Sequence, residues 1–323
     1  MCTAVSFLSN DHYFGRNLDL EYNYNEAVTI TPRNFAIRFH CRKDISIHSA
    51  LIGVATIADN YPLYYDATNE AGLSMAGLNF PGNAVYGTEH EGKDNIAPYE
   101  FIPWVLMQCK NIAEAKQLLK RTHICRIPFS REYPLSPLHW IISDKTESIT
   151  VEPMEDGLHI LDNPIGILTN NPPFEYHMAN IVNYMGLSES EPKNRLAPSL
   201  PLKPFSRGMG ALGLPGDLSS QSRFVRAAFV KLHSTKQSNE ALAVSQFFHI
   251  LGSVEQQEGC IKVENGFEKT IYSSCCNTEK GIYYYKTYEN SQITAIRLDH
   301  EDLDSYKLID YPLIRFPQIR YEN

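Results

Sequence analysis

Hydrophobic and polar residues alternate over short segments at both ends of the chain, a pattern typical of half-buried β-strands. Residues 3–8 and 12–16 flank the turn signal Ser9-Asn10-Asp11, so the chain is predicted to open with a β-hairpin. Similar segments recur later, and the last group holds a run of three tyrosines (283–285) that we expect on the sheet surface. The further predicted strands are 29–39, 50–57, 74–81, 138–143, 148–152, 158–161, 166–169, 270–276, 281–286 and 292–298.

Helical patterns interrupt these strands. A helix in two parts is expected at 98–120, where Pro103 would kink it or delay its start, and others at 174–185, 221–233 and 240–254. Residues 59–62 are predicted to form a turn beside a cluster of tyrosines, and the chain after residue 304 is predicted to be irregular.

Residues 187–221 differ from the rest of the chain in composition. Five prolines and four glycines lie in this segment, which is too long for an ordinary connection. Strands resume after it and must complete the earlier sheets, so it is not a domain linker. We expect an assembly arm or a partly ordered insert within a single domain that spans 1–323.

Composition limits the class of protein. The chain has 323 residues, 43% of them hydrophobic, which is ample for a large core. A net charge of −8 argues against a nucleic-acid-binding protein, because such proteins usually carry a basic face. No apolar run is long enough for a transmembrane helix, and the N-terminus lacks the features of a signal peptide. We therefore expect a cytoplasmic protein that does not bind membranes.

Seven cysteines are present without CxxC spacing, so they predict neither a disulfide framework nor a zinc site. Cys2 alone has a positional argument. Removal of Met1 would leave it with a free α-amine beside its thiol, and an N-terminal nucleophile can use its own amine as the base. The simpler interpretation of an isolated Met-Cys is that position 2 merely holds a small residue.

The second strand of the predicted hairpin carries two charged residues on opposite faces, because side chains alternate along a strand. Arg16 and Leu18 point one way, and Asn17 and Asp19 point the other. A guanidinium beside Cys2 would favour its thiolate, and a carboxylate could hold the ammonium form of the amine. A surface ion pair is the common alternative for an Arg and an Asp at this spacing.

Two asparagines lie at the ends of predicted strands and shortly before prolines. Asn79 precedes Phe80-Pro81, and Asn170 follows Leu168-Thr169. On local grounds, a turn-capping role is the simpler interpretation for Asn79.

Together these segments resemble the choloylglycine hydrolases (bile salt hydrolases) and the related penicillin V acylases. The resemblance covers nearly the whole chain in the expected order. It is carried by Met1-Cys2-Thr3, Phe14-Gly-Arg-Asn-Leu-Asp19, Asn69-Glu-Ala-Gly-Leu73, Ala76-Gly-Leu-Asn-Phe-Pro81, Leu168-Thr-Asn170, Gly213-Leu-Pro-Gly-Asp217, Ser222-Arg-Phe224, Glu279-Lys-Gly-Ile-Tyr-Tyr-Tyr285 and Thr287-Tyr-Glu-Asn290.

The resemblance implies an α+β fold of the N-terminal nucleophile (Ntn) hydrolase type, with four αββα layers in which two antiparallel sheets lie between helices. It implies hydrolysis of a linear amide through a thioester on Cys2, without a metal or organic cofactor. The implied catalytic residues are a nucleophile and base (Cys2), two flanking charged residues (Arg16, Asp19), two residues on the oxyanion side (Asn79, Asn170) and a supporting arginine (Arg223).

The implied substrates are glycine- or taurine-conjugated bile acids, small molecules that need an apolar pocket. Positions that align with the family's pocket wall are Leu18, Ala58, Tyr65, Phe129 and Tyr133; the family often has a larger residue at position 58. Asn79 favours bile salts over penicillin V, since the acylases favour Tyr there. The 187–221 segment resembles the arm by which family members form homotetramers. A non-catalytic binding protein on the same fold is the alternative from another class.

Overall fold

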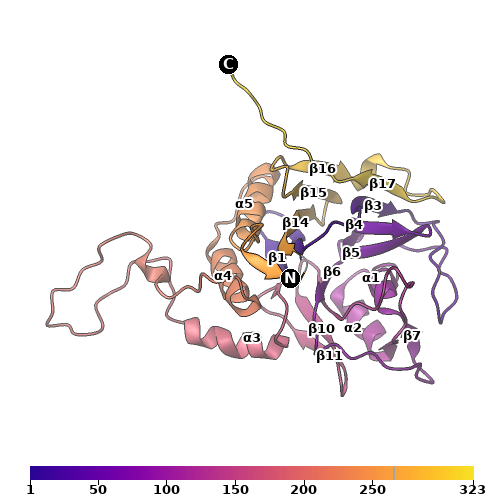
Figure 1. Ribbon diagram of the computed structural model, residues 1–323, viewed down its shortest axis with the longest axis horizontal. Coiled ribbons are helices and arrows are strands. Elements are labelled where there is room, and N and C mark those ends of the chain that lie inside the picture. Colours follow the sequence, from indigo (N-terminus) through magenta and orange to yellow (C-terminus); the bar gives the residue numbers. More distant parts are fainter. Residues whose placement is uncertain (265) are drawn as a thin grey trace.

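The computed structural model describes residues 1–264 and 266–323, and two large antiparallel sheets dominate it (Figure 1). The first sheet contains both strands of the predicted hairpin, in the order β12-β1-β2-β14-β15-β16, with β13 paired to β14. Its strands are β1 (Cys2–Leu8), β2 (His12–Leu20), β12 (Ile167–Leu168), β13 (Ile261–Val263), β14 (Gly266–Asn277), β15 (Ile282–Thr287) and β16 (Thr294–Arg297).

The second sheet has the order β11-β10-β9-β6-β5-β4-β3-β17. Its strands are β3 (Ala27–Thr31), β4 (Leu51–Ala58), β5 (Tyr61–Asn69), β6 (Ser74–Asn79), β9 (Leu138–Ser143), β10 (Ser148–Met154), β11 (Gly157–Asp162) and β17 (Ile309–Pro312). Two short strands, β7 (Asp94–Ile96) and β8 (Thr122–Ile124), form a separate parallel pair.

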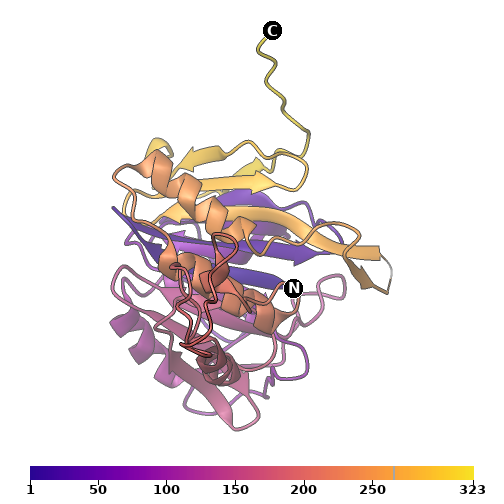
Figure 2. The same ribbon diagram turned by 90° about the vertical axis from the view of Figure 1, so that its left-hand side faces the viewer.

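Helices cover the outer face of each sheet. The α-helices are α1 (Phe101–Leu106), α2 (Ile112–Arg121), α3 (Phe174–Ile181), α4 (Ser220–His233) and α5 (Glu240–Gly252); short 3₁₀ turns lie at Pro98–Glu100, Val182–Tyr184, Met209–Ala211 and Leu298–His300. α4 and α5 lie in front of the first sheet in Figure 2, and α1 and α2 pack against the second sheet.

The core confirms the four-layer αββα arrangement. One buried apolar cluster joins residues from both sheets with residues from α4 and α5, so the inner faces of the two sheets pack against each other. A second cluster joins the outer face of the second sheet to α1 and α2. β1 and β2 therefore lie between the second sheet and a helical layer, and Cys2 at the start of β1 is buried.

Three local predictions were wrong. The strand predicted at 29–39 ends at Thr31, because Pro32 has no N–H for the ladder. The turn predicted at 59–62 is shorter than expected: only Asp59 and Asn60 have the left-handed conformation, and the tyrosines that follow belong to the strand β5. The tail, predicted to be irregular, contains the four-residue edge strand β17 and is irregular on both sides of it.

The run of three tyrosines in β15 is also not on the surface as predicted. Tyr283 and Tyr285 are buried between the sheets, and Tyr284 is half-buried. The hydroxyl of Tyr283 donates to the buried carboxylate of Asp66 on β5. A period-two pattern places alternate residues on one face, but it does not say that this face is covered.

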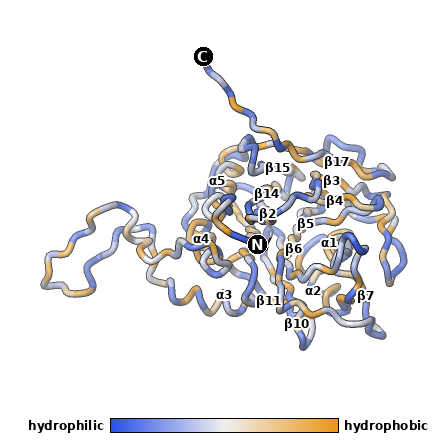
Figure 3. The backbone as a smooth tube through the Cα atoms, viewed as in Figure 1, coloured by the Kyte–Doolittle hydropathy of each residue, from blue (hydrophilic) through white to orange (hydrophobic). Residues whose placement is uncertain are grey.

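The 187–221 segment projects away from the two sheets (Figure 1). Apolar and polar stretches alternate along it in Figure 3, and three of its apolar side chains are almost fully exposed: Leu196 (86%), Phe205 (87%) and Leu212 (78%). Segments that project with exposed apolar side chains are typical of surfaces that contact another molecule.

A buried histidine in the first hairpin makes stability depend on pH. Burial lowers the pKa of His12 from 6.5 to about 4, and its ring nitrogens bond the Ser6 hydroxyl (2.9 Å) and the Thr278 hydroxyl (2.8 Å). As the pH falls below 6.5, the unfolded chain binds a proton at this residue that the folded chain does not bind until about pH 4. The folded state should therefore lose about 3 kcal/mol over this window.

The variant His12→Gln removes this titration. We expect the difference in unfolding free energy between wild type and variant, measured in urea at one protein concentration, to shrink by about 2–3 kcal/mol between about pH 7 and pH 4.5. A difference that stays constant with pH would contradict the assignment.

Candidate active site

The register of the first hairpin fixes what surrounds Cys2. Cys2 lies opposite Leu18, and Ala4 lies opposite Arg16, so all four side chains share the face between the two sheets. The neighbouring residues Thr3 and Asn17 face the helices instead; the Asn17 amide donates to the carbonyl of Leu251 on α5 (3.0 Å). The alternation predicted for the second strand is thus present, and Arg16 lies on the nucleophile's side of the sheet.

Arg16 is fully buried, which rules out a surface ion pair with Asp19. Its Nη1 donates to the carbonyls of Tyr65 (2.9 Å) and Gly77 in the second sheet. Its Nη2 has no hydrogen-bond partner among the described residues. Burial would lower the pKa of Arg16, but the nearby Cys2 sulfur, Tyr272 and Asp66 outweigh it and the pKa is raised. A permanent positive charge therefore lies near the Cys2 sulfur.

The backbone of Cys2 is held by two side chains from distant segments. Its nitrogen donates to Oδ1 of Asn170 (2.7 Å), which lies just beyond β12. The guanidinium of Arg223 on α4 donates to the Cys2 carbonyl and to Oγ1 of Thr3 (both 2.6 Å), and its other Nη donates to Asn170 Oδ1 (2.8 Å). Once Met1 is removed, the same nitrogen is the α-amine, so this network orients the predicted base.

Asp19 is a buried carboxyl group on the helix side of the sheet. Thr270 Oγ1 donates to Asp19 Oδ1 (2.6 Å), and Oδ2 has no partner within residues 1–264 and 266–323. Burial raises the pKa of Asp19, while the N-terminal ammonium and Arg223 oppose this rise. A bulge between Thr270 and Tyr272 in β14 lies beside Asp19, as bulges often do near active sites.

Met1 occupies the space next to this nitrogen. Its ammonium donates to the Asp19 carbonyl (2.9 Å) and forms an ion pair with Glu268, and its carbonyl accepts from the Asp19 N–H (3.0 Å). Removal of Met1 would free these three groups around the new α-amine. Asp19 Oδ2 and Arg16 Nη2, on opposite faces of β2, are buried without a hydrogen-bond partner among the described residues.

The two predicted strand-end asparagines lie together. Asn170 Nδ2 donates to the carbonyl of Asn79 (2.7 Å). Because both polar groups of the Asn170 side chain are engaged, this residue positions the Cys2 nitrogen and the end of β6. Asn79 is the one exposed residue of β6, so its side-chain amide is the freer donor of the two.

The predicted pocket-wall residues fall into two groups. Leu18 lies directly opposite Cys2, and the Tyr65 carbonyl binds Arg16, so both belong to the site's own surroundings. Phe129 packs edge-on against Tyr99 and near Tyr133 (ring centroids 5.2 and 6.1 Å). Ala58 ends β4 opposite Tyr61, which also contacts the Phe129 ring (5.7 Å).

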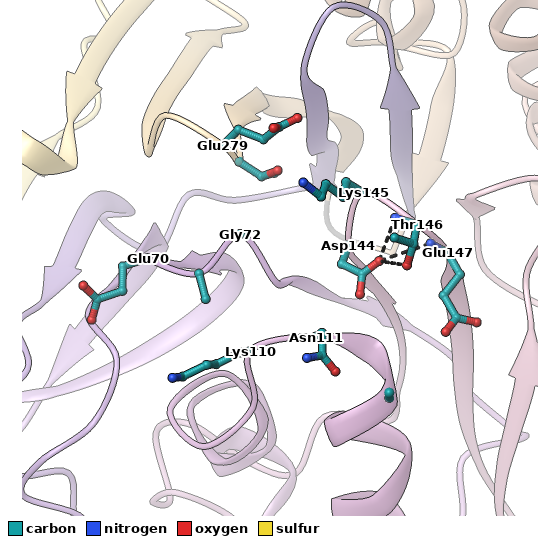
Figure 4. A pocket seen from close by; sticks show the side chains of 12 residues that line it. Glu70, Gly72, Lys110, Asn111, Asp144, Lys145, Thr146, Glu147 and Glu279 are labelled. Carbon is teal, nitrogen blue, oxygen red and sulfur yellow. Dashed lines mark hydrogen bonds between the residues drawn. The ribbon is translucent and has the colours of Figure 1, made fainter.

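Two surface cavities lie elsewhere. One, of about 430 Å³, lies between the turn at Glu70–Gly72, the start of α2 and the turn at 144–147 (Figure 4). The other, of about 450 Å³, borders the far end of the first hairpin at Ser6, Leu8 and His12. Neither contains a predicted site residue, and the chemistry described above argues for Cys2 as the centre.

Sequence reasoning missed three residues of the site: Asp66, Thr270 and Glu268. Asp66 accepts hydrogen bonds from Tyr272 and Tyr283, and burial raises its pKa against the opposing effect of Arg16. A charged residue between apolar neighbours was the available signal for Asp66. The other two give no local signal, because their importance depends on how β14 pairs with β2.

The arrangement suits nucleophilic attack on an amide, with a thiol, a permanent cation and a backbone nitrogen that would be an amine after removal of Met1. Comparison with known proteins agrees. The chain is 54% identical to a bile salt hydrolase/transferase of Lactiplantibacillus plantarum, over 96% of both chains, and 41% identical to one of Clostridium perfringens, over 95% of both.

Solved structures give the same result. A mutant of conjugated bile acid hydrolase from Clostridium perfringens superposes over 100% of both chains with a TM-score of 0.92 at 39% identity. Penicillin V acylase from Agrobacterium tumefaciens shares the fold (TM-score 0.76, 18% identity, 96% of this chain and 91% of that one). The model of the linear amide C–N hydrolases, choloylglycine hydrolase family, matches residues 2–311. The chain belongs to the choloylglycine hydrolase family of linear amide C–N hydrolases.

Proposed function

We propose that this protein hydrolyses the amide bond of glycine- or taurine-conjugated bile acids, with Cys2 as the nucleophile after Met1 has been removed. One observation carries the proposal: Arg16, Asn170 and Arg223, from three distant segments, converge on the first strand at Cys2. The names of the relatives, which share up to 54% of the aligned residues, supply the substrate class.

In the first step the α-amine of Cys2 takes the thiol proton, and the sulfur attacks the amide carbonyl carbon. Arg16 favours the thiolate, and Asn170 Oδ1 directs the amine. The carbonyl oxygen gains a negative charge, and we assign its stabilisation to the exposed side-chain amide of Asn79. Preorganised donors of this kind are worth about 2.7–4 kcal/mol each.

In the second step the C–N bond breaks, and the protonated α-amine gives its proton to the leaving nitrogen of glycine or taurine. The bile acid then remains as a thioester on Cys2. Water attacks this thioester with the amine again as base, which releases the bile acid and restores the thiol. Another amine could attack the same thioester, and the relatives' names include a transferase.

A substrate panel tests the proposal. Glycocholate and taurocholate should be hydrolysed with a kcat/KM at least about tenfold above that for penicillin V, because discrimination by a few apolar contacts is typically of that size. The measurement is release of glycine, taurine or 6-aminopenicillanic acid at about pH 6–7, where the α-amine can exchange protons. Preferred cleavage of penicillin V, or no cleavage of either bile salt, would sink the proposed substrate class.

We further propose that Leu18, Ala58, Tyr65, Phe129 and Tyr133 contribute to the apolar wall that holds the steroid. A flat apolar ligand needs a mostly apolar surface with few polar anchors. The absence of a large side chain at Ala58 would widen that wall near Tyr61.

We also propose that the single domain 1–323 assembles as a homotetramer through the 187–221 arm, in a cytoplasmic setting where Met1 can be trimmed. No helix among the described residues is long and apolar enough to cross a membrane. The exposed Leu196, Phe205 and Leu212 are the side chains that assembly would bury.

Replacing those three residues with serine should break the assembly. Light scattering should give wild type a mass about four times 36.7 kDa and the triple variant a smaller one. Leu242→Ser, which removes an exposed leucine from α5, is the matched control and should keep the wild-type mass. A monomeric wild type, or a triple variant of unchanged mass, would contradict the arm's role.

A further inference from the structure

A buried histidine on β9 is bonded at both ring nitrogens. His139 Nε2 donates to the carbonyl of Thr169 (2.9 Å), and Nδ1 lies 3.0 Å from Oε1 of Glu152 on the neighbouring strand β10. Glu152 also accepts from the backbone N–H of Phe174 at the start of α3 (3.0 Å). His139 and Glu152 are both almost fully buried.

The ring of His139 also stacks on Phe80, with centroids 4.1 Å apart and planes 6° from parallel. Phe80 directly follows Asn79, and Thr169 directly precedes Asn170. One side chain therefore contacts both asparagine-bearing segments of the site, although neither segment is its sequence neighbour.

Both ring nitrogens of His139 have fixed partners. A carbonyl can only accept, so Nε2 carries a proton that points at Thr169, and a second proton lies between Nδ1 and Oε1 of Glu152. The backbone N–H of Phe174 holds the Glu152 carboxyl group in place. The imidazole ring therefore cannot turn without breaking a buried hydrogen bond.

The position of Thr169 decides the position of Asn170. His139 binds the carbonyl of Thr169, the residue before Asn170. His177 Nε2 binds the carbonyl of Asn170 itself (3.0 Å). The Asn170 side chain in turn accepts from the Cys2 nitrogen. A shift of the Thr169 carbonyl would therefore move the acceptor that aims the base.

We propose that His139, oriented by Glu152, is a positioning residue for amide hydrolysis, which fixes the Asn79–Phe80 and Thr169–Asn170 segments relative to Cys2. The inference rests on the proposed function, because it assigns Asn170 the task of directing the α-amine. His139 acts through these two segments rather than by contact with the reacting atoms.

The test uses His139→Phe combined with Glu152→Gln. Phenylalanine keeps the stacking on Phe80 but loses both hydrogen bonds, and the glutamine side chain at position 152 avoids a buried unpaired carboxylate while it still accepts from Phe174. With glycocholate, kcat should fall about 100-fold with KM within about threefold of wild type, since misplacement by about 1 Å costs that much. Glu152→Gln alone keeps a side-chain oxygen that can accept from Nδ1, so it should retain kcat within about fivefold.

His12→Gln is the matched control, because it also removes a buried, doubly bonded histidine but lies at the other end of the hairpin. It should keep kcat within about twofold of wild type on folded protein, as judged by circular dichroism, because it is remote from Cys2. The inference is overturned if the folded double variant keeps wild-type kcat, or if His12→Gln loses as much. An inactive wild type would instead refute the proposed function.

Discussion

Cys2→Ala should abolish hydrolysis of glycocholate, with kcat lowered by at least about 10⁴-fold, because no other group in the site can form the thioester. The variant keeps the α-amine and, since Cys2 is a small buried residue of β1, should fold normally. The measurement is glycine release at saturating substrate by protein whose circular dichroism matches wild type.

Cys260→Ala is the control for this experiment, because it removes an exposed thiol far along the chain. It should keep full activity. Bile salt hydrolysis by Cys2→Ala at a rate close to wild type would mean that the nucleophile lies elsewhere, and the site assigned to the start of β1 would be wrong.

Arg223→Met should lower kcat by about 100-fold, the second-largest effect that we expect. Arg223 binds the Cys2 carbonyl, Thr3 and Asn170 at once, so its loss frees both the nucleophile's backbone and the acceptor of its nitrogen. Burial lowers the pKa of Arg223, and Asp19 opposes this effect. Because Arg223 in turn opposes the rise of the Asp19 pKa, the methionine variant removes one of the charges that stabilise the Asp19 carboxylate. The readout is kcat for taurocholate, together with the melting temperature.

Arg226→Met is the matched control one turn later on α4. Arg226 also donates to backbone carbonyls, those of Ser253 and Pro215, which lie outside the site. Its replacement should change stability and leave kcat within about threefold, because distant substitutions act independently. Equal loss of kcat in the two variants would assign Arg223 a general structural role instead.

Local pattern predicted much of this site. A period of two along the second strand places Arg16 with Leu18 and separates both from Asp19, and the structure shows that division. The pattern also predicted strand ends at Asn79 and Asn170 and a helix near Arg223. These are properties of neighbouring residues, so a single segment contains the information for each.

Contacts between distant strands could not be predicted from local sequence pattern. Cys2 meets Asn170 only because β12 pairs with β1, and Thr270 meets Asp19 only because a bulge in β14 adjusts its pairing with β2. His139 and Glu152 were visible as polar residues in apolar strands, but their contact depends on the register of β9 against β10. The family resemblance supplied the catalytic grouping that local pattern could not.

Met1 is the residue that most directly connects structure with activity. While Met1 is present, its ammonium contacts Glu268 and the Asp19 carbonyl, and its carbonyl accepts from the Asp19 N–H. The Cys2 nitrogen is then an amide, which cannot act as a base. The proposed chemistry therefore starts only after one peptide bond has been cut.

The most direct measurement is a mass spectrum of the N-terminal peptide from fully active enzyme quenched during glycocholate turnover. The mechanism predicts a peptide that begins at Cys2, part of it heavier by one cholyl group bound to sulfur as a thioester. A peptide that still begins with Met1 in fully active protein would contradict the mechanism.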